Sequence, residues 1–267
     1  MLMRKVATII FSSVLLCLTM SGPSRASVGP AVENISSEGS GALEALIYEV
    51  PNAKATLVML PGGSWNIGDI DPSSGMLTGK NFFIRTIPTF LAQEFNVVTM
   101  GKPKSAEDLQ DSVIRAGKPH AEDVLALAQR AYRLGKPVWL LGTSMGGISA
   151  VNAATADTKS LIAGVVISSP VAKKTTRILS GTLDFPLESI RVPAYVSGHE
   201  KDGCGSTPPS TTKEVASRLT SSKKVLLKMT QSGSDPSGNP CGPTHWHGYI
   251  NAESEVVQQM SDFIKSN

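Results

Sequence analysis

Short apolar runs alternate with longer amphipathic stretches along most of the chain. The short runs, such as residues 163–167 (AGVVI), are continuously apolar, which is typical of strands covered on both faces in a parallel sheet. They predict strands at 43–50, 55–60, 96–100, 138–141, 163–168, 194–197 and 224–229. The amphipathic stretches predict helices at 82–94, 121–134, 146–156, 211–220 and 253–265. Strands that alternate with helices in this way predict a doubly wound α/β fold with a mostly parallel sheet and helices on both faces.

The first 26 residues follow a different pattern. Arg4 and Lys5 precede fifteen almost wholly apolar residues (6–20), and residues 24–26 (SRA) offer the small side chains that a signal peptidase reads. The apolar run is shorter than the roughly 20 residues that a membrane-spanning helix needs. We therefore expect a signal peptide that is cleaved near Ala26, and an exported protein, periplasmic or secreted, whose mature chain has no membrane span.

After the signal peptide, the chain is expected to form one domain. Residues 27–41 are rich in Ser, Gly and Glu and show no period, so we expect a flexible lead-in there. No later linker divides the chain, and the sequence predicts a single domain over residues 42–267. The longest irregular stretch, 232–243, lies between the last predicted strand and the last predicted helix. Loops at the strand ends of open parallel sheets are where sites form.

Net charge narrows the class of partner. The chain has 25 Lys and Arg and 22 Asp and Glu in 267 residues. Arg4, Lys5 and Arg25 lie in the first 26 residues, which hold no acidic residue, so the rest of the chain carries 22 of each sign. This neutral balance gives no electrostatic reason to expect a nucleic acid or an anionic membrane as partner. A small-molecule substrate is the expected partner.

A candidate nucleophile lies between a predicted strand and a predicted helix. Residues 142–146 (GTSMG) form the only G-x-S-x-G motif in the chain. A tight strand-to-helix turn strains its central residue, and glycines on both sides give it room, so the Ser144 hydroxyl is expected to stand above the sheet edge. The Met145 N–H begins the helix, where unpaired donors favour an oxyanion. The alternative is that Ser144 only caps the helix.

This motif and the order of elements resemble the α/β-hydrolase family, over nearly the whole chain after the signal peptide. The resemblance implies the α/β-hydrolase fold, and the chain is most similar to small exported serine esterases, lipases or dienelactone hydrolases. Residues 168–194 hold no long insertion, so we expect no large lid domain. The family also implies an acid after the nucleophile in sequence, then a histidine near the C-terminus.

An acid is found in the expected place. A serine hydroxyl is a poor nucleophile at neutral pH, so a base must take its proton and a carboxylate must hold that base in the right tautomer. Asp202, in a loop that follows a predicted strand and Gly198, resembles the family acid. Glu200 is the first alternative and Asp184 the second.

The four histidines of the chain supply the candidates for the base. His247 resembles the family base, because His-Gly-Tyr stands directly before the last predicted helix. His245 stays open, since positions two apart face the same side of an extended loop. His120 is expected to be exposed at a helix start, and His199 to line the site or face solvent.

A second oxyanion donor is expected after an early strand. Residues 58–65 (VMLPGGSW) are similar to the family's oxyanion loop, and the resemblance assigns the second N–H to Gly63, beside that of Met145. Many relatives have His where this chain has Pro61. Trp65, with Ser64 beside it, is expected to form either a wall of the substrate pocket or a core contact.

Two cysteines remain after the signal peptide. In an exported protein, Cys204 and Cys241 are expected to form a disulfide, which would tie the loop of Asp202 to that of His247. The alternative is a zinc site made of the two cysteines with His245 and His247, but no Cys-x-x-Cys pair supports it. No phosphate loop or dinucleotide fingerprint occurs at a suitable turn, so no metal and no organic cofactor are expected.

The sequence therefore predicts an exported serine hydrolase that cleaves an acyl bond, with a carboxylic ester as the expected substrate. Ser144 attacks, His247 carries the proton and Asp202 orients His247. A peptidase, thioesterase or acyltransferase would use the same residues, because a fold does not fix a substrate. Two alternatives come from other classes: a hydrolase-like binding protein without turnover, and a zinc-dependent hydrolase.

Overall fold

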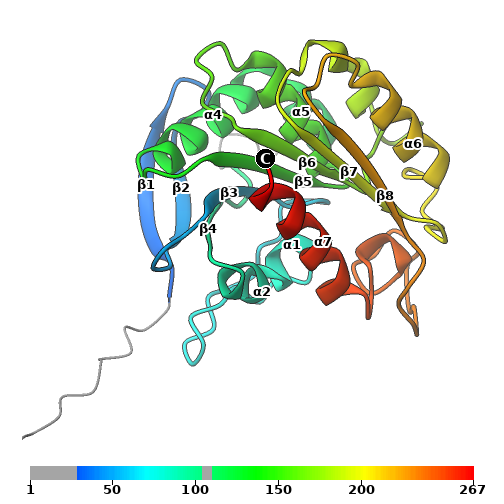
Figure 1. The fold of residues 1–267 in the computed structure, drawn as a ribbon, viewed down its shortest axis with the longest axis horizontal. Coiled ribbons are helices and arrows are strands. Elements are labelled where there is room, and N and C mark those ends of the chain that lie inside the picture. The colour runs from blue at the N-terminus through cyan, green and yellow to red at the C-terminus, as the bar shows by residue number, and fades with distance from the viewer. Residues whose placement is uncertain (1–28, 104–109) are drawn as a thin grey trace, which may run out of the picture.

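The computed structural model describes residues 29–103 and 110–267, and its fold is drawn in Figure 1. Eight strands form one sheet in the order β1-β2-β4-β3-β5-β6-β7-β8. The β1/β2 and β2/β4 pairs are antiparallel, and all others are parallel. The strands are β1 (Ala31–Ser37), β2 (Gly41–Tyr48), β3 (Ala55–Leu60), β4 (Phe95–Thr99), β5 (Val138–Thr143), β6 (Gly164–Ser168), β7 (Ala194–His199) and β8 (Val225–Thr230). The mostly parallel sheet that the sequence predicts is confirmed, while the predicted signal peptide lies outside the described residues.

Helices cover both faces of the sheet (Figure 1). One layer holds α3 (Asp111–Ala116), α4 (Lys118–Tyr132), α5 (Gly146–Ala156) and α6 (Pro209–Arg218), and the other holds α1 (Phe82–Arg85), α2 (Ile87–Ala92) and α7 (Glu253–Lys265). Successive strand residues point to opposite faces, so the apolar runs feed two cores. In β7, for example, Ala194 and Val196 belong to the core under α4 to α6, whereas Tyr195 belongs to the core under α7.

Several predicted bounds agree with the structure to the residue. β3, α5 and α7 begin and end where the sequence pattern places them. The predicted helix over 82–94 is instead two helices, because the chain turns at Thr86, whose hydroxyl donates to the Phe82 carbonyl at 2.7 Å. Pro88, in the first turn of α2, has no N–H to extend the first helix.

The expectation of a flexible lead-in over 27–41 is wrong for most of that segment. Residues 31–37 form β1, the edge strand that pairs with β2 through seven residues. The strand is mostly exposed and therefore polar, which hides it from an apolar pattern. Hydrogen bonds hold the end of β1 and the turn after it to α4. The Asp123 carboxylate of α4 accepts from the Ser37 hydroxyl and from both the N–H and the hydroxyl of Ser40.

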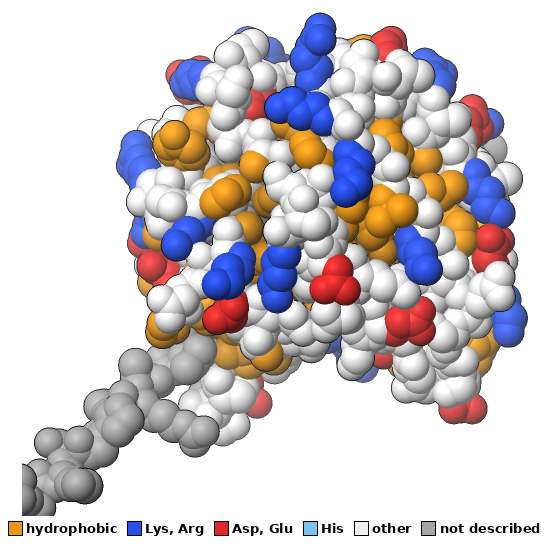
Figure 2. Space-filling view, viewed as in Figure 1, with side chains coloured by type: hydrophobic (Ala, Val, Ile, Leu, Met, Phe, Trp, Pro, Cys, Tyr) orange, Lys and Arg blue, Asp and Glu red, His pale blue; other side chains and the backbone are white. Residues whose placement is uncertain are grey.

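The opposite edge strand, β8, carries exposed apolar residues at 225–227. Lys228 lies within this strand and Lys224 directly before it, and both are exposed. Figure 2 shows Lys and Arg side chains among hydrophobic ones on this face of the molecule. Lysine on an edge strand disfavours pairing with a strand of another chain.

Among the described residues, no helix is long and apolar enough to cross a membrane.

The candidate catalytic residues follow the carboxyl ends of four parallel strands. Among these, Ser144 follows β5 and Asp202 comes three residues after β7, while the expected oxyanion loop begins at Pro61 after β3, and Ser169, a neighbour of the site, follows β6. Neighbouring parallel strands end at the same edge of a sheet, and this edge is where ligands bind in open α/β folds. Between β6 and β7 the chain forms two short 3-10 helices, η2 (Thr182–Asp184) and η3 (Leu187–Ser189), rather than a separate lid domain.

Candidate active site

Ser144 lies at the turn between β5 and α5 in a strained conformation. Its φ of 55° is in the left-handed region, which is uncommon for any residue other than glycine. Its N–H donates to the Ser168 carbonyl at the end of β6, and its carbonyl accepts from Gly147 and Val171. The residue is half-buried. The strand-to-helix turn that the G-x-S-x-G motif predicts is therefore present, with the hydroxyl-bearing residue at its tip.

The glycines around Ser144 are required by close backbone approach. A Cβ on Gly142 would lie 2.2 Å from the Gly146 carbonyl oxygen, and one on Gly146 would lie 2.0 Å from the Leu60 carbonyl oxygen. A Cβ on Gly62 would lie 2.8 Å from the Ser144 Cβ. Because real Cβ atoms do not come so close, these three positions admit only glycine. They place β3 and the loop after it directly against Ser144.

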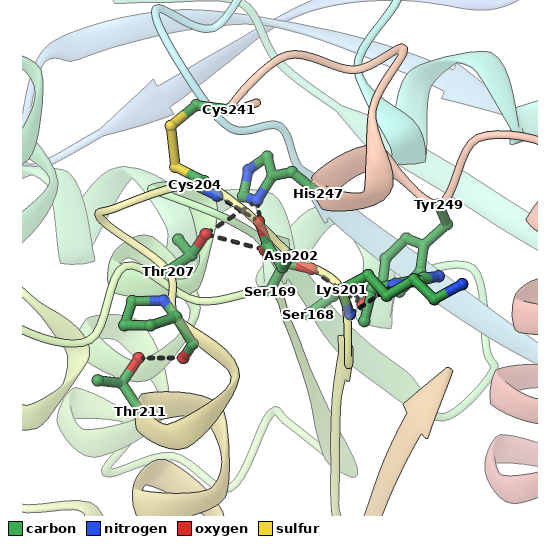
Figure 3. Close-up of polar contacts among 12 residues, drawn as sticks. Ser168, Ser169, Lys201, Asp202, Cys204, Thr207, Thr211, Cys241, His247 and Tyr249 are labelled. Carbon is green, nitrogen blue, oxygen red and sulfur yellow. Dashed lines mark hydrogen bonds and ion pairs between the residues drawn. A yellow bond between two sulfur atoms is a disulfide. The ribbon is translucent and has the colours of Figure 1, made fainter. Parts of the chain in front are cut away.

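Asp202 and His247 form a buried pair. His247 lies in the 3-10 helix η4 (Trp246–Gly248), and its Nδ1 is 2.9 Å from Asp202 Oδ2 (Figure 3). The side chain of His247 is 7% exposed and that of Asp202 is 2% exposed. A carboxylate only accepts hydrogen bonds, so this contact places the hydrogen on Nδ1 and leaves a lone pair on Nε2. An imidazole in this tautomer is suited to act as a general base.

Two further donors hold the Asp202 carboxylate. The Cys204 N–H donates to Oδ1, and the buried Thr207 hydroxyl donates to Oδ2, both at 2.9 Å. The Thr207 oxygen also lies 3.0 Å from His247 Nδ1 (Figure 3). Thr207 thus touches both members of the pair and leaves the carboxylate little freedom to turn. No motif in the sequence points to Thr207, and its only signal is its place in the same loop, five residues after Asp202.

The cysteines are joined as predicted. Cys204 and Cys241 form a disulfide across 37 residues, and Figure 3 shows it beside the imidazole of His247. The bond links the loop after β7 to the segment that leads into η4. Sulfur atoms joined in a disulfide are not thiolate ligands, so the zinc site built on these two cysteines is not formed. Among the described residues, no group of three or more His, Cys, Asp or Glu side chains is placed to hold a metal ion.

The alternative acids and bases lie in other contacts. Glu200 is 3.0 Å from the ammonium group of Lys213, and Asp184 accepts from the Gly181 N–H. His245 makes an edge contact with Trp246, and its buried Nδ1 has no partner among the described residues. Asp202 and His247 are therefore the candidates that the structure brings together.

His199 neither faces solvent nor contacts the pair. It is buried, its ring stacks on Trp246 at 4.8 Å, and its Nε2 bonds to the Ser232 carbonyl. Since a carbonyl only accepts, Nε2 carries the hydrogen and Nδ1 accepts the Lys201 N–H. His199 therefore fixes the loop around η4.

Tyr249 fastens the segment of His247 to the sheet. Its hydroxyl lies 2.9 to 3.1 Å from the hydroxyls of three serines at the ends of β6 and β7, namely Ser168, Ser169 and Ser197. Burial raises the pKa of Tyr249, so the phenol stays protonated. On the other side of η4, the Arg85 guanidinium donates to the Gly248 carbonyl and pairs with Glu253. From the sequence, position 249 is only an aromatic residue after His247 and Gly248.

A chain of hydrogen bonds through Ser168 and Tyr249 connects the turn of Ser144 with the segment of His247. Ser168 accepts the Ser144 N–H with its carbonyl and bonds Tyr249 with its hydroxyl, and Tyr249 is two residues after His247. No hydrogen bond joins Ser144 to His247 within residues 29–103 and 110–267. Such contacts are often long without substrate and tighten only when it binds.

Free backbone donors lie on both sides of Ser144. Within the described chain, the N–H groups of Met145, Gly63 and Ser64 donate to no other group. Gly63 has a φ of 57°, and both Gly63 and Ser64 are exposed. These three N–H groups are thus available to a ligand. We call residues 61–65 the glycine loop.

Trp65 is a core residue and does not line an open pocket. Its ring is 2% exposed, lies over the Arg115 guanidinium and meets the His120 ring edge-on at 5.6 Å. The expectation that His120 is exposed is wrong, since His120 is buried too. It lies in the first turn of α4, on the face that packs against α5, where its Nε2 bonds to the Ser149 hydroxyl at 2.8 Å.

The burial of His120 predicts an acid-sensitive stability. Burial, with the nearby charge of Arg115, lowers the pKa of His120 from 6.5 to about 3. Between these values the unfolded chain binds a proton that the folded chain does not, so stability falls as the pH falls. The contribution is up to about 1.4 kcal/mol per pH unit. In urea unfolding at pH 7, 6 and 5, His120→Asn should show a shallower decline in unfolding free energy than the wild type. Equal slopes would contradict the assignment.

Two cavities of the described chain lie away from these residues. One, of about 530 Å³, is lined by β1, α4 and the segment after α5, and another, of about 380 Å³, lies beside the C-terminal residues. Neither is lined by Ser144, Asp202 or His247. The candidate site is therefore not part of either cavity.

Solved structures of α/β hydrolases share the fold of this chain. An esterase from Pyrococcus furiosus is similar, with a TM-score of 0.63 and 15% identity over 90% of this chain and 93% of that one. An α/β serine hydrolase without a lid from Xanthomonas campestris has a TM-score of 0.59 and 14% identity over 89% and 94%. A puromycin-hydrolysing peptidase from Mycobacterium tuberculosis has a TM-score of 0.62 and 14% identity over 89% of this chain but 40% of that one.

These likenesses establish that the chain has the α/β-hydrolase fold. No protein-family model matches the chain, and no curated protein matches it.

Proposed function

We propose that the protein is a serine hydrolase that cleaves an acyl bond, with a carboxylic ester as its substrate. Ser144 is the nucleophile, His247 the general base and Asp202 the residue that orients His247. The observation that carries the proposal is the buried bond between His247 Nδ1 and Asp202 Oδ2, at the sheet edge where Ser144 stands in a left-handed turn. The esterases among the similar structures agree with it.

In the first half of the reaction, the Ser144 Oγ attacks the acyl carbon while its proton passes to His247 Nε2. The carbonyl π electrons move onto the oxygen, and the resulting oxyanion is stabilised by backbone N–H groups of Met145 and the glycine loop. When the tetrahedral intermediate collapses, the bond to the leaving alcohol breaks. The alcohol oxygen takes the proton from His247, and the acyl group stays on Ser144.

In the second half, water replaces the alcohol. It gives one proton to His247 Nε2 as its oxygen bonds to the acyl carbon, and collapse returns that proton to the Ser144 Oγ. The products are a carboxylic acid and the free hydroxyl. Throughout, Asp202 accepts the Nδ1 hydrogen and stabilises the imidazolium that forms in each half.

A labelling experiment tests the class and the nucleophile together. The protein is incubated with a fluorophosphonate probe and digested, and the modified peptide is identified by mass spectrometry; in parallel it is assayed against nitrophenyl esters from acetate to decanoate and against the matching anilides. We expect the label on Ser144 and hydrolysis of the esters. No label and no hydrolysis would favour a binding protein, and turnover that a chelator removes would favour a metal-dependent hydrolase.

The proposal includes export. The disulfide suits an oxidising compartment, and the basic and apolar residues at the start of the chain are those of a signal peptide. Expression of the full chain in a bacterial host, followed by fractionation and intact-mass analysis, should find a product that starts near Ser27 outside the cytoplasm. A product that retains residues 1–26 in the cytoplasm would contradict export.

The disulfide should support both stability and turnover. Replacing Cys204 and Cys241 by Ser removes a cross-link between the two loops that carry Asp202 and His247, and we expect the unfolding free energy to fall by roughly 2 to 4 kcal/mol. Misplacement of the imidazole should lower kcat by roughly 10- to 100-fold. The control is reduction by a thiol, which should lower the kcat of the wild type by a similar factor and leave that of the double variant unchanged. Equal kcat in both proteins would show that the bond is not needed for the geometry.

A further inference from the structure

Arg115, at the end of α3, is a charged residue with no exposed surface. Its Nη2 donates to the carbonyls of Pro61 at 2.9 Å and of Gly63 at 3.0 Å. Its Cζ lies 3.4 Å from the centre of the Trp65 ring, in a cation–π stack. A single guanidinium thus holds three of the five residues of the glycine loop.

The charge of Arg115 is used for these contacts. Burial lowers the pKa of Arg115 to about 9, so it remains protonated at neutral pH. None of its hydrogen bonds among the described residues goes to a carboxylate. A buried charge is costly unless its surroundings compensate it. Here the two loop carbonyls, a hydroxyl and an indole face contact the guanidinium, and the charge of Asp111 favours its protonated form, while Nε has no partner among the described residues. We see no other reason in the packing for an arginine at this position.

Ser149 and His120 hold the other side of the guanidinium. Nη1 of Arg115 donates to the Ser149 oxygen at 2.9 Å, so the Ser149 hydrogen is free to donate to His120 Nε2. The lowered pKa of His120 keeps that ring neutral and able to accept. This relay from α4 through α5 orients the planar guanidinium, and a flexible ammonium group would be oriented less well.

The loop that Arg115 holds is strained. Both Gly63 and Trp65 have left-handed backbone conformations, with φ of 57° and 58°. For a bulky residue such as Trp65 this conformation is unfavourable and persists only where surrounding contacts impose it. The stack on Arg115 is such a contact. Without it, we expect the loop to relax.

The contacts also decide where a backbone donor points. Because a trans peptide is planar, the C=O of one residue and the N–H of the next point in opposite directions. The Gly63 carbonyl points inward to Arg115, so the Ser64 N–H points away from it, to the exposed side of the loop. This N–H donates to no group among the described residues. It is a free donor of fixed direction, two residues after Gly62, which lies against Ser144.

We infer that Arg115 is a positioning residue of the oxyanion hole, which holds the glycine loop so that the Ser64 N–H, together with that of Met145, meets the oxyanion. The inference rests on the proposed function. It adds the Ser64 N–H as a donor and the Arg115 side chain as the group that orients this donor. Arg115 itself does not touch the substrate, because it is sealed behind the loop.

The test compares three variants with the wild type. Arg115→Met keeps an apolar stem but removes every donor, and Arg115→Lys keeps the charge without the planar fork. Asn152→Ala is the matched control: Asn152 is buried and bonds to the carbonyls of Arg115 and Gly117, so its loss weakens the same segment without removing a loop contact. Each protein is measured for thermal unfolding, for kcat and KM with a nitrophenyl ester, and for inhibition by an aryl trifluoromethyl ketone, which forms a tetrahedral oxyanion on serine.

We expect Arg115→Met to lose about 10²- to 10³-fold in kcat, the usual effect of losing an oxyanion donor, with KM changed by less than about threefold. Affinity for the ketone should fall by a similar factor, because the ketone needs the same donors. Arg115→Lys should keep a higher kcat and a higher affinity for the ketone than Arg115→Met. Asn152→Ala should be less stable but keep its kcat within about threefold. This split between kcat and KM is not expected of a residue that only stabilises the fold.

Three outcomes overturn the inference. They are an unchanged kcat in a folded Arg115→Met, a rise in KM without a fall in kcat in that variant, or a fall in kcat of equal size in Asn152→Ala. If Arg115→Met does not fold, Arg115→Lys decides, since wild-type kcat and ketone affinity in that variant would show that the planar fork is not needed. An inactive, unlabelled wild type would overturn the proposed function and this inference with it. An active wild type with a tolerant Arg115 overturns only the inference.

Discussion

Ser144→Ala should lower kcat/KM for a nitrophenyl ester by about 10⁶-fold, the largest effect that we expect of any single substitution. The methyl group can neither attack the acyl carbon nor pass a proton to His247, so only background hydrolysis remains. His247→Ala should have nearly the same effect, because an unassisted serine hydroxyl is not nucleophilic at neutral pH. Since the two act as one unit, the double variant should be no slower than either single one.

The neighbouring histidine provides the matched control. His245 lies two residues from His247 but contacts no carboxylate among the described residues, so His245→Gln should keep kcat/KM within about threefold. Rates are measured with active-site titration, so that traces of wild-type enzyme are not counted as residual activity. If Ser144→Ala keeps more than about 1% of wild-type activity, or if His245→Gln loses what His247→Ala loses, these roles are assigned wrongly.

The elements that the sequence predicts best are those whose pattern reflects burial. β3, α5 and α7 have the predicted bounds because each either fills the core or turns one apolar face to it. β1 escapes prediction because an edge strand is mostly exposed, and its pairing depends on a partner strand that only the fold brings near. The helix α3 is missed because it is only six residues long and the residues that it buries, Ser112 and Arg115, are polar.

The residues of the candidate site also differ in how far the sequence predicts them. Ser144, Asp202 and His247 can be proposed from the sequence because a motif, an order along the chain and neighbouring strands point to them. The choice between His245 and His247 depends on which ring faces Asp202, and alternation in an extended loop does not decide it.

The contacts of Thr207 and Arg115 cannot be predicted from the sequence. Arg115 is 52 residues from Gly63, whose carbonyl it holds. A long-range bond to a backbone carbonyl leaves no trace in composition or spacing, because any loop can offer a carbonyl.

Asp202→Asn should lower kcat by about 10⁴-fold while the fold stays intact. The reason lies in the two donors that hold the carboxylate. The Cys204 N–H donates to one oxygen, so an asparagine at this position would turn its own oxygen to Cys204 and its NH₂ to the place of Oδ2. That NH₂ would then face His247 Nδ1, which accepts it only if the ring hydrogen moves to Nε2. An imidazole with its hydrogen on Nε2 has no lone pair there for the Ser144 proton.

Glu200→Gln is the control for this prediction. Glu200 is two residues away and pairs with Lys213 at the surface, so the same chemical change there should leave kcat within about twofold. Both variants are compared with the wild type in kcat, KM and thermal unfolding. A loss in Glu200→Gln, or near wild-type kcat in Asp202→Asn, would show that another carboxylate orients the base. The expected pattern, a large loss in kcat with little change in KM or unfolding temperature, would mean that Asp202 acts on the tautomer of His247, because neither substrate binding nor folding depends on which ring nitrogen carries the hydrogen.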